Sequence, residues 1–290
     1  MMRNMTFIIH PCQTVRWLVL LMSVVACVLP HPVCAQYDLL SAKQPVADKG
    51  YRFWVYTPAD YYYSQEYTPL VLFLHGASLC GRDINRSLRY GPIDAVKRGR
   101  DIPAIIVTPQ NPGGAWSPKK LNDILEWMEK NYAYDHSRVY VLGMSLGGYG
   151  TLDFVGTYPE KIAAALALCG GCTLKDMSRL GELPLWIVHG TADKAVSVKE
   201  SKRVVNAIKA KKADSRLRYD WFSGASHGAL ARFFYSAKTY DWLFSHSLRD
   251  STRAVNRQTT ITPTDLQQAY RDIERRADQL EVELNNESTK

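Results

Sequence analysis

The 290-residue sequence has little of what builds metal centres, repeat arrays or nucleic-acid-binding surfaces. No His-Glu-x-x-His motif occurs, and the single Cys-x-x-Cys motif has no second one to complete a zinc site. No internal repeat is evident, and no nucleic-acid-binding motif accompanies the net charge of +8. We therefore expect no metal, no other cofactor and no nucleic-acid partner.

An apolar run near the start of the chain is too short to cross a membrane as a helix. Residues 17–29 are predominantly apolar, follow two arginines and precede the small-residue segment 33–35. This order is typical of a secretory signal peptide and its cleavage site. We predict a signal peptide over residues 1–35 and a secreted or periplasmic product. Residues 24–27 also resemble a lipobox, so an alternative is a protein anchored by lipid on Cys27.

Apolar segments alternate with helical patterns from about residue 51 onward. We expect strands at 51–56, 70–74, 104–107, 139–142, 163–168, 185–188 and 218–222, and helices at 121–131, 146–158, 198–210 and 229–245. This alternation indicates an α/β fold with a mostly parallel sheet flanked by helices. A hydrophobic content of 46% is sufficient for one core. We predict a single domain over residues 36–250, without a separate lid domain.

The most informative segment is residues 139–148, where an apolar strand runs into Gly-Met-Ser-Leu-Gly and then into a helical pattern. Gly-x-Ser-x-Gly between a strand and a helix is the nucleophile elbow. The turn is so tight that the residues two positions before and after the serine must lack bulk, which Gly143 and Gly147 provide. We therefore predict that Ser145 is a catalytic nucleophile at the edge of the sheet.

A serine nucleophile needs a histidine base and a carboxylate that orients the histidine. After a nucleophile elbow, the acid and then the histidine follow the serine along the chain. Asp193 follows the strand at 185–188, and His227 follows the strand at 218–222, so both would reach the edge where Ser145 emerges. Asp176 also lies between the serine and the histidine and is an alternative acid.

The tetrahedral intermediate of such a reaction needs two N–H donors for its oxyanion. Leu146, directly after the nucleophile, would supply one. We assign the other to Ala77 or a neighbouring residue, because Gly76 allows close approach in the loop after the strand at 70–74. His75 is interpreted as a structural histidine at the end of that strand. Trp116 is either an aromatic platform that binds an acyl or sugar group or a tryptophan that packs its own loop.

These motifs resemble those of the α/β-hydrolase superfamily over residues 51–246. The resemblance is carried by Leu74-His75-Gly76, by Val107-Thr108-Pro109-Gln110 with Trp116, by Gly143-Met144-Ser145-Leu146-Gly147-Gly148, and by His189-Gly190-Thr191-Ala192-Asp193. Within the superfamily the chain is similar to secreted esterases of the carbohydrate-esterase and polyhydroxybutyrate-depolymerase-like groups. Dienelactone hydrolases and phospholipase/carboxylesterases are more distant relatives.

The resemblance implies a serine esterase that cleaves carboxylic esters through an acyl-enzyme, with small-molecule or polymer-borne esters, including acylated polysaccharides, as substrates. Ala77 stands where lipases of the longer oxyanion type carry a further glycine, which argues against bulky tertiary alcohols. One alternative is a peptidase of the prolyl-oligopeptidase type, which usually has a gating domain that this sequence lacks. The other is a binding protein on an inactive hydrolase scaffold, although Ser145, Asp193 and His227 are all present.

Three cysteines follow the predicted signal peptide: Cys80, Cys169 and Cys172. Cys169 and Cys172 have the spacing of a redox motif but lack a thioredoxin-like context, so we interpret them as structural. The loops after the strands at 70–74 and 163–168 would lie at the same edge of the sheet. We therefore predict a disulfide from Cys80 to Cys169 or Cys172.

Residues 251–290 are predicted to form a linker and a C-terminal amphipathic helix. Thr262 and Pro263 mark a helix start, and apolar residues then recur at spacings of four and three: Leu266, Tyr270, Ile273, Ala277, Leu280 and Leu284. The stripe covers under three heptads, which is short for an independent coiled coil. We expect it to dock either on the catalytic domain or on a second copy of the chain, which would produce self-association.

Overall fold

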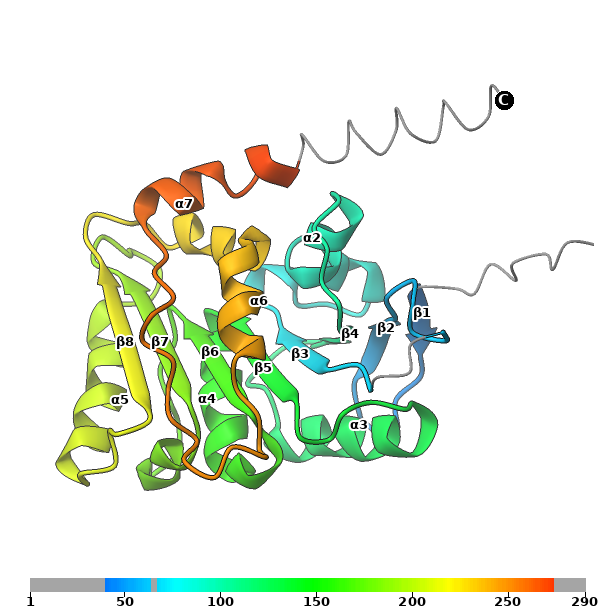
Figure 1. Cartoon of the computed structure of the whole chain (residues 1–290), viewed down its shortest axis with the longest axis horizontal. Helices are drawn as coiled ribbons and strands as arrows, with labels where there is room; N and C mark the ends of the chain where they lie inside the picture. Colours follow the sequence, from blue (N-terminus) through cyan, green and yellow to red (C-terminus); the bar gives the residue numbers. More distant parts are fainter. Residues whose placement is uncertain (1–39, 64–66, 274–290) are drawn as a thin grey trace, which may run out of the picture. The chain divides into compact units, whose positions relative to one another are not determined.

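The computed structural model describes residues 40–63 and 67–273 (Figure 1). At its centre lies an eight-stranded sheet in the order β1-β2-β4-β3-β5-β6-β7-β8. The strands are β1 (Leu40–Lys43), β2 (Arg52–Tyr56), β3 (Leu70–Leu74), β4 (Ile105–Gln110), β5 (Val139–Met144), β6 (Ala164–Leu168), β7 (Leu185–Gly190) and β8 (Leu217–Phe222). Neighbours from β4 to β8 are parallel, whereas β2 is antiparallel to both β1 and β4. The predicted mostly parallel sheet is confirmed.

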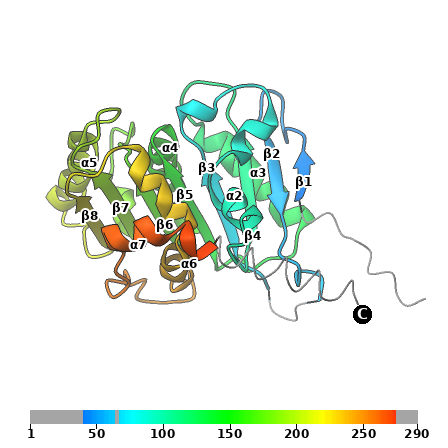
Figure 2. The same ribbon diagram turned by 90° about the horizontal axis from the view of Figure 1, so that it is seen from above.

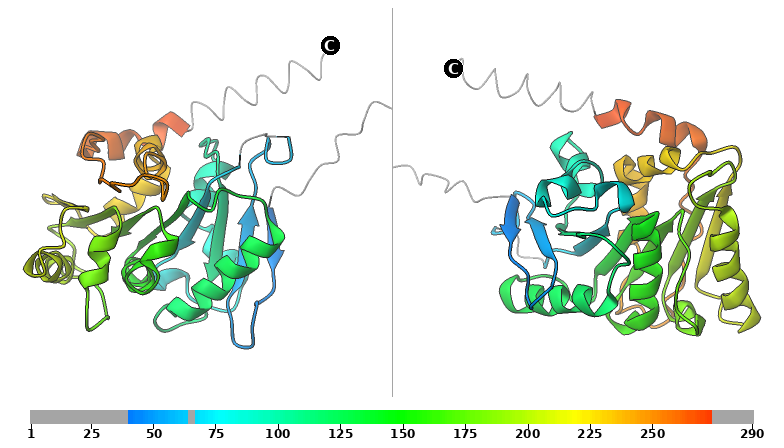
Figure 3. Two further views of the ribbon diagram at one scale, coloured as in Figure 1. Left: turned by 60° about the horizontal axis from the view of Figure 1, so that its bottom comes forward. Right: turned by 180° about the vertical axis from the view of Figure 1, so that it is seen from behind.

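Helices cover both faces of the sheet (Figures 2 and 3). One face carries α3 (Pro118–Asn131), α4 (Leu146–Thr157) and α5 (Val198–Ala210). The other carries α2 (Pro92–Lys97), the 3₁₀ helix η5 (Gly228–Tyr235), α6 (Ala237–Phe244) and α7 (Pro263–Gln268). Two buried apolar clusters, one on each side of the sheet, form the core.

Local sequence explains where these helices begin and which side they bury. In α3 the Ser117 hydroxyl accepts a hydrogen bond from the N–H of Lys120, and Pro118 occupies the first turn, where its missing N–H has no consequence. The buried residues of this helix recur at helical spacing: Leu121, Ile124, Leu125 and Met128. The side chain of Ser197 caps α5 in the same way.

The helix predicted at 229–245 is wrong in its continuity, because the segment forms two elements separated by the extended residue Ser236. Phe233, Phe234 and Tyr235 are consecutive and all buried. Consecutive side chains point in different directions in either kind of helix, and all three are buried because η5 packs against β7, α2 and α7. Strand β1 and helix α2 are not among the elements predicted from the sequence.

The described part of the tail docks on the domain, on the face that carries η5 and α6 (Figure 2). Leu266, Ala269 and Ile273 are buried there, and the Tyr270 ring lies 4.5 Å from that of Tyr235. The Thr262 side chain and backbone both pair with Asp265 in a capping box, which sets the start of α7. Docking on the same chain is thus confirmed for these residues, whereas Ala277, Leu280 and Leu284 lie outside the described residues.

Ending the chain at Ser251 is expected to lower the stability and solubility of the domain. The truncation removes five buried apolar residues and uncovers their partners; the five are Val255, Ile261, Leu266, Ala269 and Ile273. Losing one buried Leu or Ile side chain costs about 2–5 kcal/mol, so the loss of all five should exceed about 3 kcal/mol. The predicted catalytic residues, Ser145, Asp193 and His227, all precede the cut, so the predicted activity should persist wherever the shortened protein remains folded.

Sizing chromatography and thermal unfolding of the truncated chain test this expectation. A chain that ends at Ile273 is the matched control, because it keeps the docked residues. Identical unfolding temperature, solubility and mass-corrected elution for the Ser251 truncation would contradict the docking argument.

Candidate active site

The nucleophile elbow lies between β5 and α4. Ser145 has φ 59° and ψ −123°, a strained backbone for a residue with a side chain, and its N–H donates to the carbonyl of Leu168 at 2.9 Å. The two glycines of the motif lie where no side chain fits. A Cβ on Gly147 would overlap the carbonyl oxygen of Leu74, and one on Gly143 would overlap that of Gly147. The tight turn therefore presents Ser145 at the carboxyl edge of the sheet.

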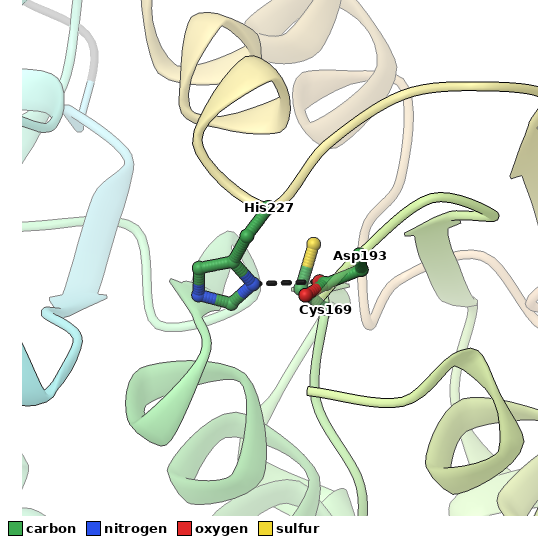
Figure 4. A group of neighbouring side chains, drawn as sticks. All are labelled: Cys169, Asp193 and His227. Carbon is green, nitrogen blue, oxygen red and sulfur yellow. Dashed lines mark hydrogen bonds and ion pairs between the residues drawn. The ribbon is translucent and has the colours of Figure 1, made fainter. Parts of the chain in front are cut away.

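Asp193 and His227 meet at the same edge, beyond the ends of β7 and β8 (Figure 4). The Nδ1–H of His227 donates to Oδ2 of Asp193 at 2.6 Å, while Oδ1 accepts the N–H groups of Ala195 and Val196 at 2.8 and 2.9 Å. The Asp193 side chain is fully buried, whereas that of His227 is 23% exposed. Because Nδ1 carries the proton given to Asp193, Nε2 of a neutral His227 has a free lone pair.

The Asp193 carboxyl is held in its charged form. Burial alone would raise its pKa, but the backbone N–H of Val196 and the ring of His227 outweigh burial, and the pKa lies below its usual range. The alternative acid, Asp176, is exposed, and its carboxylate accepts from the N–H of Ser178 at 2.9 Å. Of the two candidate acids, the structure therefore pairs Asp193 with His227.

The loop after β3 lies against Ser145. A Cβ on Gly76 would be 3.3 Å from Cβ of Ser145 and 2.9 Å from the Tyr90 hydroxyl oxygen, which accepts the Gly76 N–H at 2.6 Å. Ala77 begins the 3₁₀ helix η1 (Ala77–Leu79) and Leu146 begins α4, so neither N–H has a partner inside its own helix. Both predicted oxyanion donors thus stand at helix starts on either side of this contact.

His75 and Trp116 hold that loop in place through hydrogen bonds to its backbone. His75 is fully buried; its Nδ1–H donates to the Gly76 carbonyl at 2.8 Å, and Nε2 accepts the N–H of Asn111 at 3.1 Å. Burial lowers the pKa of His75 to about 4, so the ring stays neutral. Trp116 is only 3% exposed, and its Nε1–H donates to the His75 carbonyl at 3.2 Å. Of the two roles predicted for Trp116, its burial and its hydrogen bond to His75 agree with packing inside the protein and not with a platform exposed to substrate.

Tyr90 is a neighbour of the site that was not predicted from the sequence. Its ring packs edge-on against Phe73 and is stacked with Phe234, which brings the hydroxyl to Gly76. Tyr90 lies in a segment without a strand or a motif, so no sequence signal marks it. The following Gly91 has φ 111°, and a side chain there would collide with Phe73.

The predicted disulfide is wrong: Cys80, Cys169 and Cys172 are free thiols in the structure. Cys169 follows β6 and faces Asp193, on the side of β7, whereas Cys80 follows β3, two strands away on the other side. Cys169 and Cys172 also belong to apolar clusters on opposite faces of the sheet. Sharing one edge of the sheet therefore does not bring the sulfurs together.

Cys169, Asp193 and His227 place their ligand atoms within 4.8 Å of one another, a spacing that a metal ion could use. The Nδ1–Oδ2 distance of 2.6 Å is, however, that of a hydrogen bond. Two ligands of one tetrahedral zinc ion would be about 3.3 Å apart. Burial, and then the Asp193 charge, also raise the pKa of the Cys169 thiol, which keeps it protonated. The geometry fits an acid–histidine pair better than a cation site.

Comparison with known proteins agrees with this geometry. The model of the dienelactone hydrolase family matches residues 89–241, more than half of the chain. The chain belongs to the dienelactone hydrolase family. The α/β-hydrolase superfamily predicted from the motifs is thereby confirmed, and the family is one that the motifs had placed among the more distant relatives.

Individual relatives of this dienelactone hydrolase family member are matched over short stretches. It is 33% identical over 81 residues, or 28% of its length, to a bifunctional acetylxylan esterase/xylanase of Neocallimastix patriciarum. It is 37% identical over 51 residues, or 18% of its length, to poly(3-hydroxyalkanoate) depolymerase C of Paucimonas lemoignei. Each match covers 12% of the relative.

A solved structure gives a longer match. The crystal structure of a thermostable esterase superposes with a TM-score of 0.60 at 25% identity, over 72% of this chain and 64% of that one. The sheet and flanking helices described above are therefore an α/β-hydrolase fold. Within residues 40–63 and 67–273, no helix is both long enough and apolar enough to cross a membrane.

Proposed function

We propose that the chain is a serine esterase that hydrolyses carboxylic esters through an acyl-enzyme. The observation that carries the proposal is the 2.6 Å bond between His227 and the buried Asp193, at the sheet edge where the elbow presents Ser145. A strained serine, an imidazole with a free Nε2 and a buried carboxylate are the groups that acyl transfer requires. Family membership supports the same activity.

In this mechanism Oγ of Ser145 bonds to the ester carbonyl carbon while its proton passes to Nε2 of His227. The oxyanion receives hydrogen bonds from the N–H groups of Ala77 and Leu146. Collapse of the intermediate breaks the bond to the alcohol, which leaves with the proton from His227. Water then repeats the steps on the acyl-enzyme and releases the acid. Asp193 keeps the His227 ring oriented and stabilises its charged form.

We propose acyl groups borne on polysaccharides as the substrate class. Two features support a polymeric substrate: one matched relative carries acetylxylan in its name, and no separate lid domain is present in the described part of the chain. A site without a lid can accept an ester attached to a long chain. Acetyl, feruloyl and longer-chain esters, assayed side by side, would identify the acyl group.

Labelling with a fluorophosphonate probe tests the nucleophile, because such probes bond only to activated serines. We expect label on Ser145 of the wild type and none on the Ser145→Ala variant. Absence of label and of ester hydrolysis in the folded wild type would support the binding-protein alternative. Faster cleavage of a peptide amide than of any ester in the panel would favour the peptidase alternative.

Export of the protein also remains a proposal, because residues 1–35 lie outside the described residues. We propose that the signal peptide is removed after Ala35, which releases a chain that starts at Gln36. N-terminal sequencing of the protein from the culture medium or periplasm tests this directly. A lipidated Cys27 at the new N-terminus would instead establish the anchored form.

Replacing Tyr90 with phenylalanine is expected to lower turnover on the order of 10-fold to 10²-fold with little change in the KM for ester. The variant keeps the ring that packs against Phe73 and Phe234 but loses the hydroxyl that fixes the Gly76 N–H. A displacement of about 1 Å beside the reacting atoms is sufficient for a loss of this size. Steady-state kinetics on the best ester of the panel provides the measurement.

Tyr235→Phe is the control for this variant. It removes a hydroxyl that donates to Asp94 at the same distance, 2.6 Å, and lies in η5 rather than in the loop beside Ser145. We expect it to change stability but not turnover. Equal turnover in Tyr90→Phe and the wild type would show that the hydroxyl does not position the loop.

A further inference from the structure

His189, the fifth residue of β7, contacts the carboxylate of Asp193 from inside the protein. Its side chain is fully buried, and Nε2 lies 3.2 Å from Oδ2 of Asp193, the same oxygen that accepts the hydrogen bond from Nδ1–H of His227. Nε2 also lies 2.9 Å from the carbonyl oxygen of Val196. Asp193 therefore stands between two histidines, one buried and one at the surface of the site.

The neighbours of His189 determine where its proton lies. Both groups facing Nε2, a carbonyl and a carboxylate, are acceptors, so Nε2 must carry a hydrogen. On the other side, Nδ1 is 2.7 Å from the hydroxyl of Ser201, which donates to the carbonyl of Gly170 at 2.6 Å. That arrangement favours a second proton on Nδ1, whereas burial lowers the pKa of His189 and opposes it. In either state the Nε2–H lies between the Val196 carbonyl, its nearer acceptor at 2.9 Å, and Oδ2 of Asp193 at 3.2 Å.

We propose that His189 is a positioning residue for the catalytic carboxylate: its Nε2–H, which Asp193 shares with the Val196 carbonyl, holds Asp193 in line with His227 and takes up part of the carboxylate charge. It thereby limits how strongly Asp193 stabilises the imidazolium of His227, the form that cannot act as the base. The proposal deepens the serine esterase function proposed above and rests on it. His189 touches neither substrate nor Ser145 in this role; it acts through Asp193.

His189 and His227 share the carboxylate of Asp193, and this sharing determines how replacement of His189 should change the protonation of His227. A carboxylate that also serves His189 stabilises the imidazolium of His227 less than one that serves His227 alone. Removing the His189 donor should therefore raise the pKa of His227. Since the neutral ring is the base, the acid limb of the pH profile for kcat/KM should move to higher pH.

Other titratable groups near Asp193 leave this argument unchanged. From the end of β6 the neighbour is Cys169, whose pKa is raised by burial and then by Asp193, so it is neutral. From α5 the neighbour is the uncharged hydroxyl of Ser201, while Glu200 and Arg203 of the same helix pair with each other at 3.4 Å. Beyond β8 the neighbour is His227 itself.

Two substitutions at His189 separate the Asp193 contact from the rest of the ring. His189→Asn keeps a polar group near Nδ1, toward Ser201, but loses the donor to Asp193. His189→Gln keeps an amide near the position of Nε2. We expect the acid limb of kcat/KM to rise by about one pH unit in the Asn variant. The Gln variant should stay close to the wild type, with KM little changed in both.

His246→Gln serves as the control. His246 is a buried histidine beside α6 that accepts the N–H of Asn256 at 2.9 Å. Its substitution should change stability without moving the acid limb. A shift equal to that of His189→Asn would mean that loosened packing, not the Asp193 contact, moves the limb, and the proposal would fail.

NMR titration of ¹⁵N-labelled histidines gives a readout that needs no hydrolysis. We expect the midpoint of His227 to rise in His189→Asn by the same amount as the acid limb. An unchanged midpoint in a folded Asn variant would falsify the role of His189. If the wild type neither hydrolyses esters nor takes the fluorophosphonate label, the esterase function fails, while the NMR comparison still decides whether His189 sets the protonation of His227.

Discussion

Ser145→Ala is expected to lower the turnover number for ester hydrolysis by on the order of 10³-fold or more while the protein remains folded. In the proposed mechanism the hydroxyl oxygen forms the acyl-enzyme, and the other residues of the elbow, Gly143, Met144, Leu146 and Gly147, carry no hydroxyl or thiol that could replace it. Alanine is smaller than serine, so the strained backbone and the contact with Gly76 can persist. His227→Ala should have an effect of similar size, because an unassisted serine hydroxyl is a poor nucleophile.

The double variant distinguishes two residues that act together as one catalytic unit from two residues that contribute independently to turnover. Residues that act as a unit are non-additive, so Ser145→Ala combined with His227→Ala should be about as slow as either single variant. Burst and steady-state kinetics on the same ester, with circular dichroism to verify folding, make the comparison. Turnover near that of the wild type in folded Ser145→Ala would refute the mechanism.

Gly147→Ala is expected to have the largest effect on folding. A methyl group on Gly147 would overlap the backbone carbonyl of Leu74, where β3 ends, and a backbone carbonyl cannot rotate away as a side chain can. Overpacking of a core usually costs about 1–3 kcal/mol, and with a main-chain atom as the obstacle we expect at least the upper end of that range. Displacement of the elbow should also abolish labelling of Ser145 by a fluorophosphonate.

Chemical denaturation of Gly147→Ala beside Gly228→Ala tests this expectation. A methyl group on Gly228 would meet no atom of the described residues within 4 Å beyond its chain neighbours, and the φ of Gly228 is ordinary. Its substitution should therefore leave the free energy of unfolding nearly unchanged. Equal stabilities for the two variants would mean that the approach of α4 to β3 is looser than the structure indicates.

Periodicity and motif context were sufficient to predict the sheet and which side chains its carboxyl edge brings together. The strands at 70–74, 139–142 and 185–188 are apolar runs next to glycine, and a parallel sheet brings their carboxyl ends to one edge whatever the details of packing. Asp193 and His227 therefore meet as expected. These predictions depend on backbone topology, which local sequence specifies well.

Predictions that depend on the direction of a side chain were less accurate. Cys80 and Cys169 share an edge of the sheet but face different neighbours, and Trp116 lies in a loop yet points inward beneath His75. The segment 229–245 forms two elements with a break at Ser236, and the three adjacent aromatic residues before the break are all buried. Such outcomes are decided by tertiary packing, which has no local pattern in the sequence.

The docked tail bears on how the protein folds during synthesis. The last strand of the sheet ends at Phe222, but the apolar surface of η5 and α6 is covered only when Ile273 has left the ribosome. At about 5–20 residues per second this interval is a few seconds. A nascent or prematurely terminated chain therefore presents aromatic surface after its sheet is complete. Chaperone binding should be concentrated in that interval, and nonsense mutations between residues 251 and 273 should produce aggregates rather than shortened enzymes.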